Sequence, residues 1–168
     1  MVGTGVKMPR GLLTYPAGTT NPGQIEQIHS GDANLVTADS LIRISFSVKE
    51  PYMANARFLM QRSAVASVML LKDTQQRYLR QPSYMASQPA SHVGYPIAWA
   101  ADMPAIAAGA TPIAFGDFRQ AYIIVDRPGI STLRDPFTAK PFVLFYTRRR
   151  IGGEVVSFEA YKLLLIGV

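Results

Sequence analysis

The stretch FVLFYTRRRIGG, residues 142–153, decides how the rest of the chain is interpreted. Five apolar or aromatic residues lead into a threonine, three arginines and two glycines, a run that is typical of a β-strand. Because successive side chains of a strand point to opposite faces, the alternation divides the stretch into two sets. One face carries Phe142, Leu144, Tyr146, Arg148 and Arg150, and the other carries Val143, Phe145, Thr147, Arg149 and Ile151. We therefore predict one long strand over 142–151, which Gly152 and Gly153 interrupt or bend.

Three interpretations of the arginine triplet are open. It is the solvated end of a strand, a surface for nucleic acid, or a surface for another copy of the chain. A nucleic-acid-binding sheet interleaves several aromatic rings with several basic groups on one face. Here Phe145 falls with Arg149 and Tyr146 with Arg148, so neither face has that combination. Guanidinium groups on both faces suit bidentate pairing with neighbours on either side, so we favour an inter-subunit surface over nucleic acid.

Composition places the chain among single-domain globular proteins. It has 168 residues, of which 48% are hydrophobic and 17% charged, and this argues against disorder. The net charge is +6, and the segment 119–150 contributes +5 of it. A local excess of this kind faces polyanions or the carboxylates of a neighbouring subunit. The segment contains Arg119, Arg127, Arg134, Lys140, Arg148, Arg149 and Arg150, against only Asp126 and Asp135.

Several classes of function lack support in the sequence. The absence of cysteine excludes disulfides and thiolate metal sites. The apolar runs are too short for a membrane span, and no signal peptide is visible. His29 and His92 have no partner at metal-ligand spacing, and neither a P-loop nor a nucleophile elbow occurs. We therefore expect no enzyme, no metal or cofactor, no membrane and no small-molecule substrate.

The periodicity of residues 37–49 fits two structures. Alternation of Ile42, Ile44 and Phe46 with polar residues is typical of a strand. Thr37 as an N-cap and Asp39 in a first turn are typical of a helix. By periodicity alone the strand is narrowly favoured.

The rest of the chain reads as short strands, one helix and long loops. A strand is expected around 11–14 and another around 24–29. A buried strand is expected at 57–61, followed by a helix over 64–72 that Ser63 caps. Loops at 80–94 and 101–112 flank a strand at 95–100. The strands 121–126 and 130–135 are separated by Arg127-Pro128-Gly129, placed as in a type II turn. One or two strands follow from 154 onward, so the fold class is α+β with more strand than helix.

An ordered series of motifs resembles a known family. The run FGDFRQAYIIVDRPGISTLRDPFTAKPFVLFYTRRRIGGEVVSFEAYKLL is similar to the end of tailed-phage major capsid proteins of the Hong Kong 97 type. Upstream, PRGLLTY, PYMANARFLM, GYPI and DMPAIAAGATPIAFGDF continue the resemblance in the right order over nearly the whole chain.

The resemblance implies an axial domain with a central mixed sheet flanked by helices, and part of a peripheral domain with a long β-sheet. Residues 1–14 would connect from a spine helix, and 15–135 would form the axial-like domain. Residues 136–157 would be the peripheral-like strands, and 158–168 a final strand that returns to the axial domain. The segment at 38–48 would be a helix, against the periodicity. The family's N-terminal arm, extended loop and spine helix have no counterpart, so we expect a shortened form.

The function implied is that of a structural subunit in a phage or prophage capsid. Copies would associate into pentamers and hexamers of a shell around double-stranded DNA, in a virion whose subunits are made in the bacterial host cytoplasm. Portal, protease or scaffold would be further partners. The expected interface residues are Arg148, Arg149, Arg150, Arg134 and Lys140. Two alternatives are a stand-alone basic nucleic-acid-binding module and a related shell-forming compartment protein.

Overall fold

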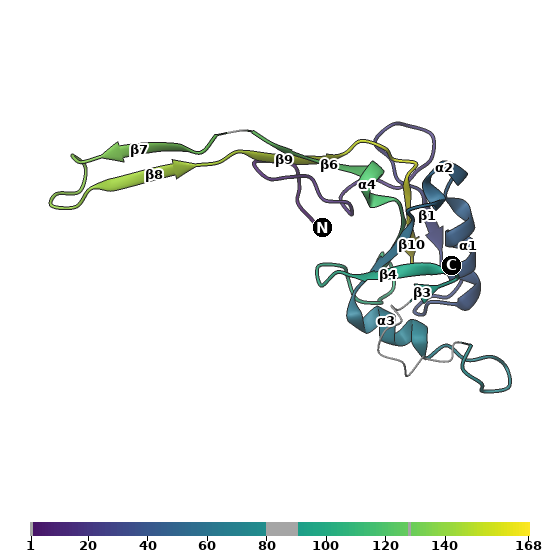
Figure 1. Ribbon diagram of the computed structural model, residues 1–168. Helices are drawn as coiled ribbons and strands as arrows, with labels where there is room; N and C mark the ends of the chain where they lie inside the picture. The colour runs from purple at the N-terminus through teal and green to yellow at the C-terminus, as the bar shows by residue number, and fades with distance from the viewer. Residues whose placement is uncertain (1, 80–90, 128) are drawn as a thin grey trace.

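The computed structural model describes residues 2–79, 91–127 and 129–168. The chain forms a lobe built on a β-sheet, and a long two-stranded ribbon extends from it (Figure 1). The predicted α+β class is confirmed, because short helices and a mixed sheet occur together. None of the helices in the described ranges has the length and hydropathy that a membrane-spanning helix needs.

The lobe is organised by a six-stranded mixed sheet in the order β1-β10-β5-β2-β4-β3. The pairs β1/β10 and β2/β4 are parallel, while β10/β5, β2/β5 and β3/β4 are antiparallel. The strands are β1 (Gln27–His29), β2 (Arg57–Met60), β3 (Ser91–His92), β4 (Tyr95–Trp99), β5 (Ile113–Gly116) and β10 (Tyr161–Leu165). The strands expected near 24–29, at 57–61 and at 95–100 are therefore confirmed. The strand expected at 11–14 is wrong, because these residues form a turn that Thr14 N–H closes onto the Gly11 carbonyl at 3.3 Å.

Strand alternation gives the sheet two apolar faces. Phe58, Met60 and Phe115 point into a core with helices α1 (Ala38–Ser47) and α3 (Arg62–Met69). On the other face, Tyr161 and Leu163 pack with the N-terminal residues Leu12, Tyr15 and Ile25. Helix α2 (Glu50–Met53) follows α1 directly. Both faces of the sheet are therefore covered within one chain.

Residues 38–47 form helix α1, so the strand favoured by periodicity is wrong and the helix implied by the family resemblance is right. Thr37 Oγ1 accepts a hydrogen bond from the Ser40 N–H at 3.2 Å and caps the helix. Leu41 and Ile44 are fully buried against the sheet, while Phe46 is 73% exposed. The alternation in the sequence favoured a strand because Ile42 and Phe46 are apolar although they lie on the outer side of the helix.

Helix α3 differs from its predicted bounds. It begins two residues earlier, with Gln61 at the N-cap and without a side-chain cap, so Ser63 does not cap it. At the end of the helix, the carbonyl groups of Ala66, Ser67 and Val68 accept backbone hydrogen bonds in the cap at Leu70. The helix therefore ends before Lys72. Of the two expected loops, 101–112 is irregular, while residues 80–90 of the other lie outside the described residues and 91–92 form β3.

The ribbon consists of two antiparallel pairs that follow one another. Helix α4 (Phe118–Ala121), capped by Asp117, leads from the lobe into it. Strand β6 (Tyr122–Asp126) pairs with β9 (Ile151–Val155), and β7 (Ser131–Asp135) pairs with β8 (Leu144–Arg148). We call the junction between the two pairs the waist. β6 and β7 do not pair with each other, and Pro128 of the predicted turn lies outside the described residues.

The predicted continuous strand 142–151 is interrupted at residues 149–150, near its C-terminal end. β8 ends at Arg148, and β9 begins at Ile151. The glycines expected to break the strand lie inside β9 instead, where Gly153 leaves room for the Tyr122 ring. A Cβ on Gly153 would lie 2.5 Å from the Tyr122 hydroxyl oxygen. The glycine therefore permits close packing at the root of the ribbon.

The N-terminal segment fastens the ribbon root to the lobe. Arg10 N–H donates to the Gly153 carbonyl at 2.9 Å, and the Tyr122 hydroxyl donates to the Arg10 carbonyl at 2.9 Å. The Val155 N–H donates to the buried Tyr15 hydroxyl oxygen at 3.1 Å. The ribbon comprises the strands at 122–126, 131–135, 144–148 and 151–155.

Candidate functional site: the arginine cluster of the ribbon

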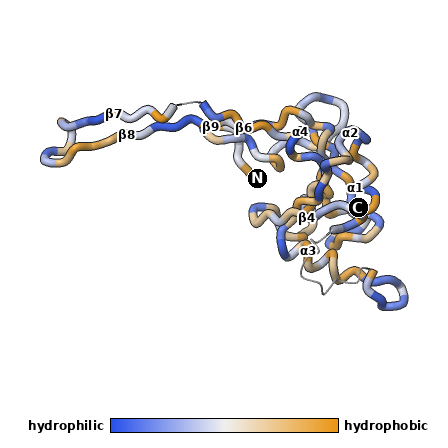
Figure 2. The backbone as a smooth tube through the Cα atoms, in the orientation of Figure 1, coloured by the Kyte–Doolittle hydropathy of each residue, from blue (hydrophilic) through white to orange (hydrophobic). Residues whose placement is uncertain are grey.

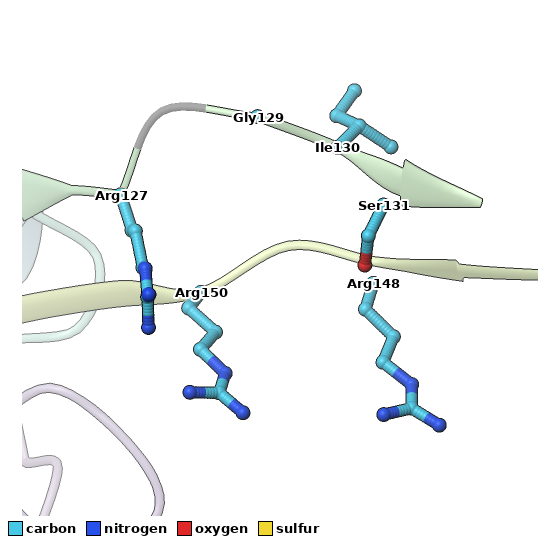
Figure 3. Close-up of a pocket in the computed structure, with 6 residues that line it drawn as sticks. All are labelled: Arg127, Gly129, Ile130, Ser131, Arg148 and Arg150. Atoms are coloured by element: carbon cyan, nitrogen blue, oxygen red, sulfur yellow. The ribbon is translucent and has the colours of Figure 1, made fainter.

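Three arginines from two chain segments meet at the waist. The Arg127 N–H donates to the Arg150 carbonyl at 3.1 Å, so these residues lie opposite each other one step beyond the end of β6/β9. Ser131 lies opposite Arg148 at the start of β7/β8. Arg127, Arg148 and Arg150, which we call the arginine cluster, extend to the same side of the ribbon (Figure 3). With Gly129, Ile130 and Ser131 they line a hollow of about 420 Å³.

The cluster carries an uncompensated positive charge. Within residues 2–79, 91–127 and 129–168, no carboxylate oxygen lies within 4.0 Å of a cluster guanidinium nitrogen. All three residues are exposed. Like charges directly opposite each other on two strands are destabilising. The hollow therefore suits an anion that accepts several hydrogen bonds at once.

Arg149 differs from its two neighbours, because it is paired within the chain. Its guanidinium donates to both carboxylate oxygens of Asp126, through Nε at 3.2 Å and through Nη2. This hydrogen bond lowers the pKa of the Asp126 carboxyl and raises the pKa of Arg149. Strand alternation therefore places Arg149, whose charge Asp126 neutralises, on one face, and Arg148 and Arg150, which have no carboxylate partner among the described residues, on the other.

The other two expected interface residues lie farther along the ribbon. Arg134 is an exposed residue of β7, opposite Phe145. Lys140 is exposed in the loop that joins β7 to β8 at the tip. Asp135 organises this loop by accepting hydrogen bonds from the Phe137 and Thr138 N–H groups and the Thr138 hydroxyl, and these bonds lower its pKa. The tip and the waist are therefore separate basic positions.

Arg127 is the cluster member that we did not predict as an interface residue. The sequence interpretation placed it in a type II turn between two strands. Arg127 lies opposite Arg150 only because β6 pairs with β9, so its place in the arginine cluster depends on the pairing of these two strands.

Apolar side chains cover much of the ribbon and are exposed. Phe137 at the tip is 78% exposed, Phe142 is 71% exposed and Ile124 is 70% exposed. Figure 2 shows hydrophobic residues along β8 toward the tip and hydrophilic residues at the waist. A two-stranded ribbon is marginal in water without packing against a further surface. Exposed apolar area of this extent marks an interaction surface.

A second hollow lies at the root of the ribbon. It has a volume of about 510 Å³ and a mainly apolar lining. Its walls come from the N-terminal segment, the sheet, α4 and β6, and include Leu12, Leu59, Ala98, Phe118, Tyr122 and Ile124. The surface around the ribbon is therefore apolar at the root and basic at the waist.

Groups able to hold a metal ion are not gathered in the described part of the chain. No three His, Asp or Glu side chains there are close enough to hold a metal ion. The largest buried ionisable side chain, Tyr161, donates a hydrogen bond to the Leu12 carbonyl at 3.0 Å, and burial raises its pKa. This tyrosine fastens the N-terminal segment to the sheet.

The comparison with known families shows to which family the chain belongs. The model of the phage capsid family matches residues 1–166. This chain belongs to the phage capsid family. No curated protein sequence matches it.

Solved capsids show the same fold as this member of the phage capsid family. The capsid of a native GTA particle, determined with C5 symmetry, is 39% identical with a TM-score of 0.85, and the match covers 100% of this chain and 59% of that one. The capsid of an empty GTA particle is 40% identical with a TM-score of 0.81, covering 95% and 57%. Gordonia phage Cozz is 14% identical with a TM-score of 0.54, covering 90% and 54%, and shares the fold alone. The chain thus spans less than three fifths of the length of these capsid chains.

Proposed function

We propose that this chain is the C-terminal part of the structural subunit of a phage or GTA-like capsid. Copies associate around local symmetry axes into pentamers and hexamers of a shell that encloses double-stranded DNA. Membership of the phage capsid family and the identity of about two fifths with two GTA capsid chains support this proposal. The C5 symmetry of those capsids supports self-association.

The lobe and the ribbon correspond in this proposal to the two domains of the Hong Kong 97 fold. The lobe, with its six-stranded mixed sheet, is the axial domain. The ribbon, from Tyr122 to Val155, is part of the peripheral domain. The return of the chain through β10 into the centre of the sheet supports this division, because it makes the ribbon an excursion from one lobe.

The observation that carries the proposal is the exposed apolar surface of the ribbon. Burying one large apolar side chain contributes roughly 1.5–3 kcal/mol. Phe137, Phe142, Phe145 and Ile124 are each at least 64% exposed in the single chain. Contact with neighbouring copies would bury several of them, and this burial would favour association against its entropic cost.

Sedimentation velocity at increasing concentration tests the proposal directly. A subunit of a shell should form oligomers, and negative-stain electron microscopy should show rings or shell fragments. A protein that stays monomeric up to the millimolar range would contradict self-association. The measurement needs no assumption about which surface is used.

A stand-alone nucleic-acid-binding module is the second candidate. The arginine cluster favours it, because three guanidinium groups without a carboxylate could contact phosphates. Three phosphate contacts to duplex DNA would give a salt slope of about −2.7 in a logarithmic plot of affinity. Gel shifts at several salt concentrations measure that slope, and weak binding without a slope would argue against this candidate.

A further inference from the structure

We infer that the hollow lined by Arg127, Arg148 and Arg150 binds carboxylates of a second copy of this chain. The inference rests on the proposed function and names the chemistry of one contact within it. Each guanidinium presents a planar set of donors that matches a carboxylate in a bidentate arrangement. The Ser131 side chain lies beside them in the same hollow and adds a hydroxyl donor.

The waist carries a positive charge that an anion from outside the chain would neutralise. Asp126 is the acidic residue of the waist, and it is already bonded to Arg149. Arg127 and Arg150 stay opposite each other and share one side with Arg148. Their mutual repulsion is relieved when an anion enters the hollow, because one carboxylate attracts all three groups.

The chain itself offers carboxylates for this role. All eleven Asp and Glu residues lie in the described ranges. Eight of them form ion pairs or hydrogen bonds within the chain, such as Glu26 with Lys162 at 2.5 Å and Glu159 with Lys49 at 2.6 Å. The remaining three are exposed, and among the described residues none has an ion pair or accepts a hydrogen bond through its carboxylate. They are Asp39, Glu50 and Asp102.

Apolar neighbours favour a protein partner over the phosphates of DNA. Strand alternation puts Leu133 and Tyr146, which lie opposite each other, on the same face as Ser131 and Arg148. Leu133 is 60% exposed and Tyr146 is 45% exposed. A phosphodiester backbone offers no apolar surface to cover them, whereas a protein surface presents carboxylates and apolar groups together.

The first experiment compares self-association of the wild type with that of Arg127→Gln/Arg148→Gln/Arg150→Gln by sedimentation velocity. We expect the dissociation constant to rise at least tenfold. The matched control removes three exposed arginines of the lobe in Arg43→Gln/Arg62→Gln/Arg119→Gln, with the same change of net charge. The control should stay within twofold of the wild type. Thermal melting followed by circular dichroism verifies that both variants fold.

The second experiment identifies the carboxylate by charge exchange. Arg150→Glu should weaken self-association, and one of Asp39→Lys, Glu50→Lys or Asp102→Lys should restore it at least fivefold in the same chain. Each lysine substitution alone serves as its control. If none of the three restores association, the inference is wrong.

The outcomes separate this inference from the proposed function. Equal self-association of the wild type and the cluster variant would overturn the inference and leave the capsid function standing. If the same variant then lost binding to duplex DNA in a gel shift, the anion would be phosphate. A wild type that never associates would contradict both the inference and the capsid function.

Discussion

Arg127 and Arg150 lie opposite each other across the ribbon, joined by a backbone hydrogen bond of 3.1 Å, and neither side chain has a carboxylate partner among the described residues. In the isolated chain this pair is therefore repulsive. Arg127→Gln should raise the free energy of unfolding by a few tenths of a kcal/mol at low salt. Urea denaturation at 20 mM and 500 mM salt measures the effect, which should vanish at the higher concentration because salt screens exposed charges. A variant less stable than the wild type at low salt would contradict the repulsion.

Gly153 and Gly152 provide a matched pair at the root of the ribbon. Gly153→Ala would bring a Cβ to 2.5 Å from the Tyr122 hydroxyl oxygen, so the ring would have to move away from the Arg10 carbonyl that it bonds. We expect a loss of about 1–3 kcal/mol in the free energy of unfolding, as for other overpacked sites. At Gly152 the nearest atom, the Val125 carbonyl oxygen, is 3.9 Å from the Cβ position, so Gly152→Ala should be nearly neutral. Chemical denaturation of the two variants gives the comparison, and equal stability would show that the Tyr122 contact is unimportant.

Thr37 connects the cap of helix α1 to the preceding strand. Its Oγ1 accepts from the Ser40 N–H at 3.2 Å and donates to the Ser30 carbonyl at 2.8 Å. Thr37→Ala should cost about 1 kcal/mol of stability, while Thr37→Ser should retain most of it because the hydroxyl remains. Urea denaturation distinguishes the two variants. A serine variant as unstable as the alanine variant would assign the effect to the lost methyl group.

The ion pair between Asp126 and Arg149 makes stability depend on pH. The folded pKa of Asp126 is lowered, so its contribution is present above the unfolded pKa of about 3.9 and is lost as pH falls through the lower folded value. Asp126→Asn should therefore be less stable than the wild type at pH 7, and the difference should be smaller at pH 2. Denaturation curves at both values test this sign. A difference that grew with acidification would contradict it.

Local sequence patterns predicted which segments are strands better than how the strands pair. The ribbon strands Tyr122–Asp126 and Ser131–Asp135 lie within the segments 121–126 and 130–135 expected from the sequence. The strands at Arg57–Met60 and Tyr95–Trp99 are short apolar runs, and their type follows from composition. The periodicity did not predict helix α1, because the apolar residues Ile42 and Phe46 face outward. Only the family resemblance indicated this helix. The break after Arg148 and the position of Arg127 depend on which strands pair. Pairing between distant segments is a property of the fold, so periodicity within one segment could not give it.

Among the expected interface residues, the structure assigns different environments to the three consecutive arginines. Arg149 bonds Asp126, whereas Arg148 and Arg150 belong to the arginine cluster. The triple substitution Arg148→Ala/Arg149→Ala/Arg150→Ala in the complete subunit should therefore reduce particle yield in electron micrographs at least tenfold. The pair Arg148→Gln/Arg150→Gln should reproduce most of that loss, and Arg149→Gln alone should cause little, because its guanidinium is already neutralised within the chain. Normal yield from the triple variant would show that the waist is not an assembly contact. If Arg149→Gln alone caused most of the loss, the face that carries Arg149, and not the arginine cluster, would be the contact.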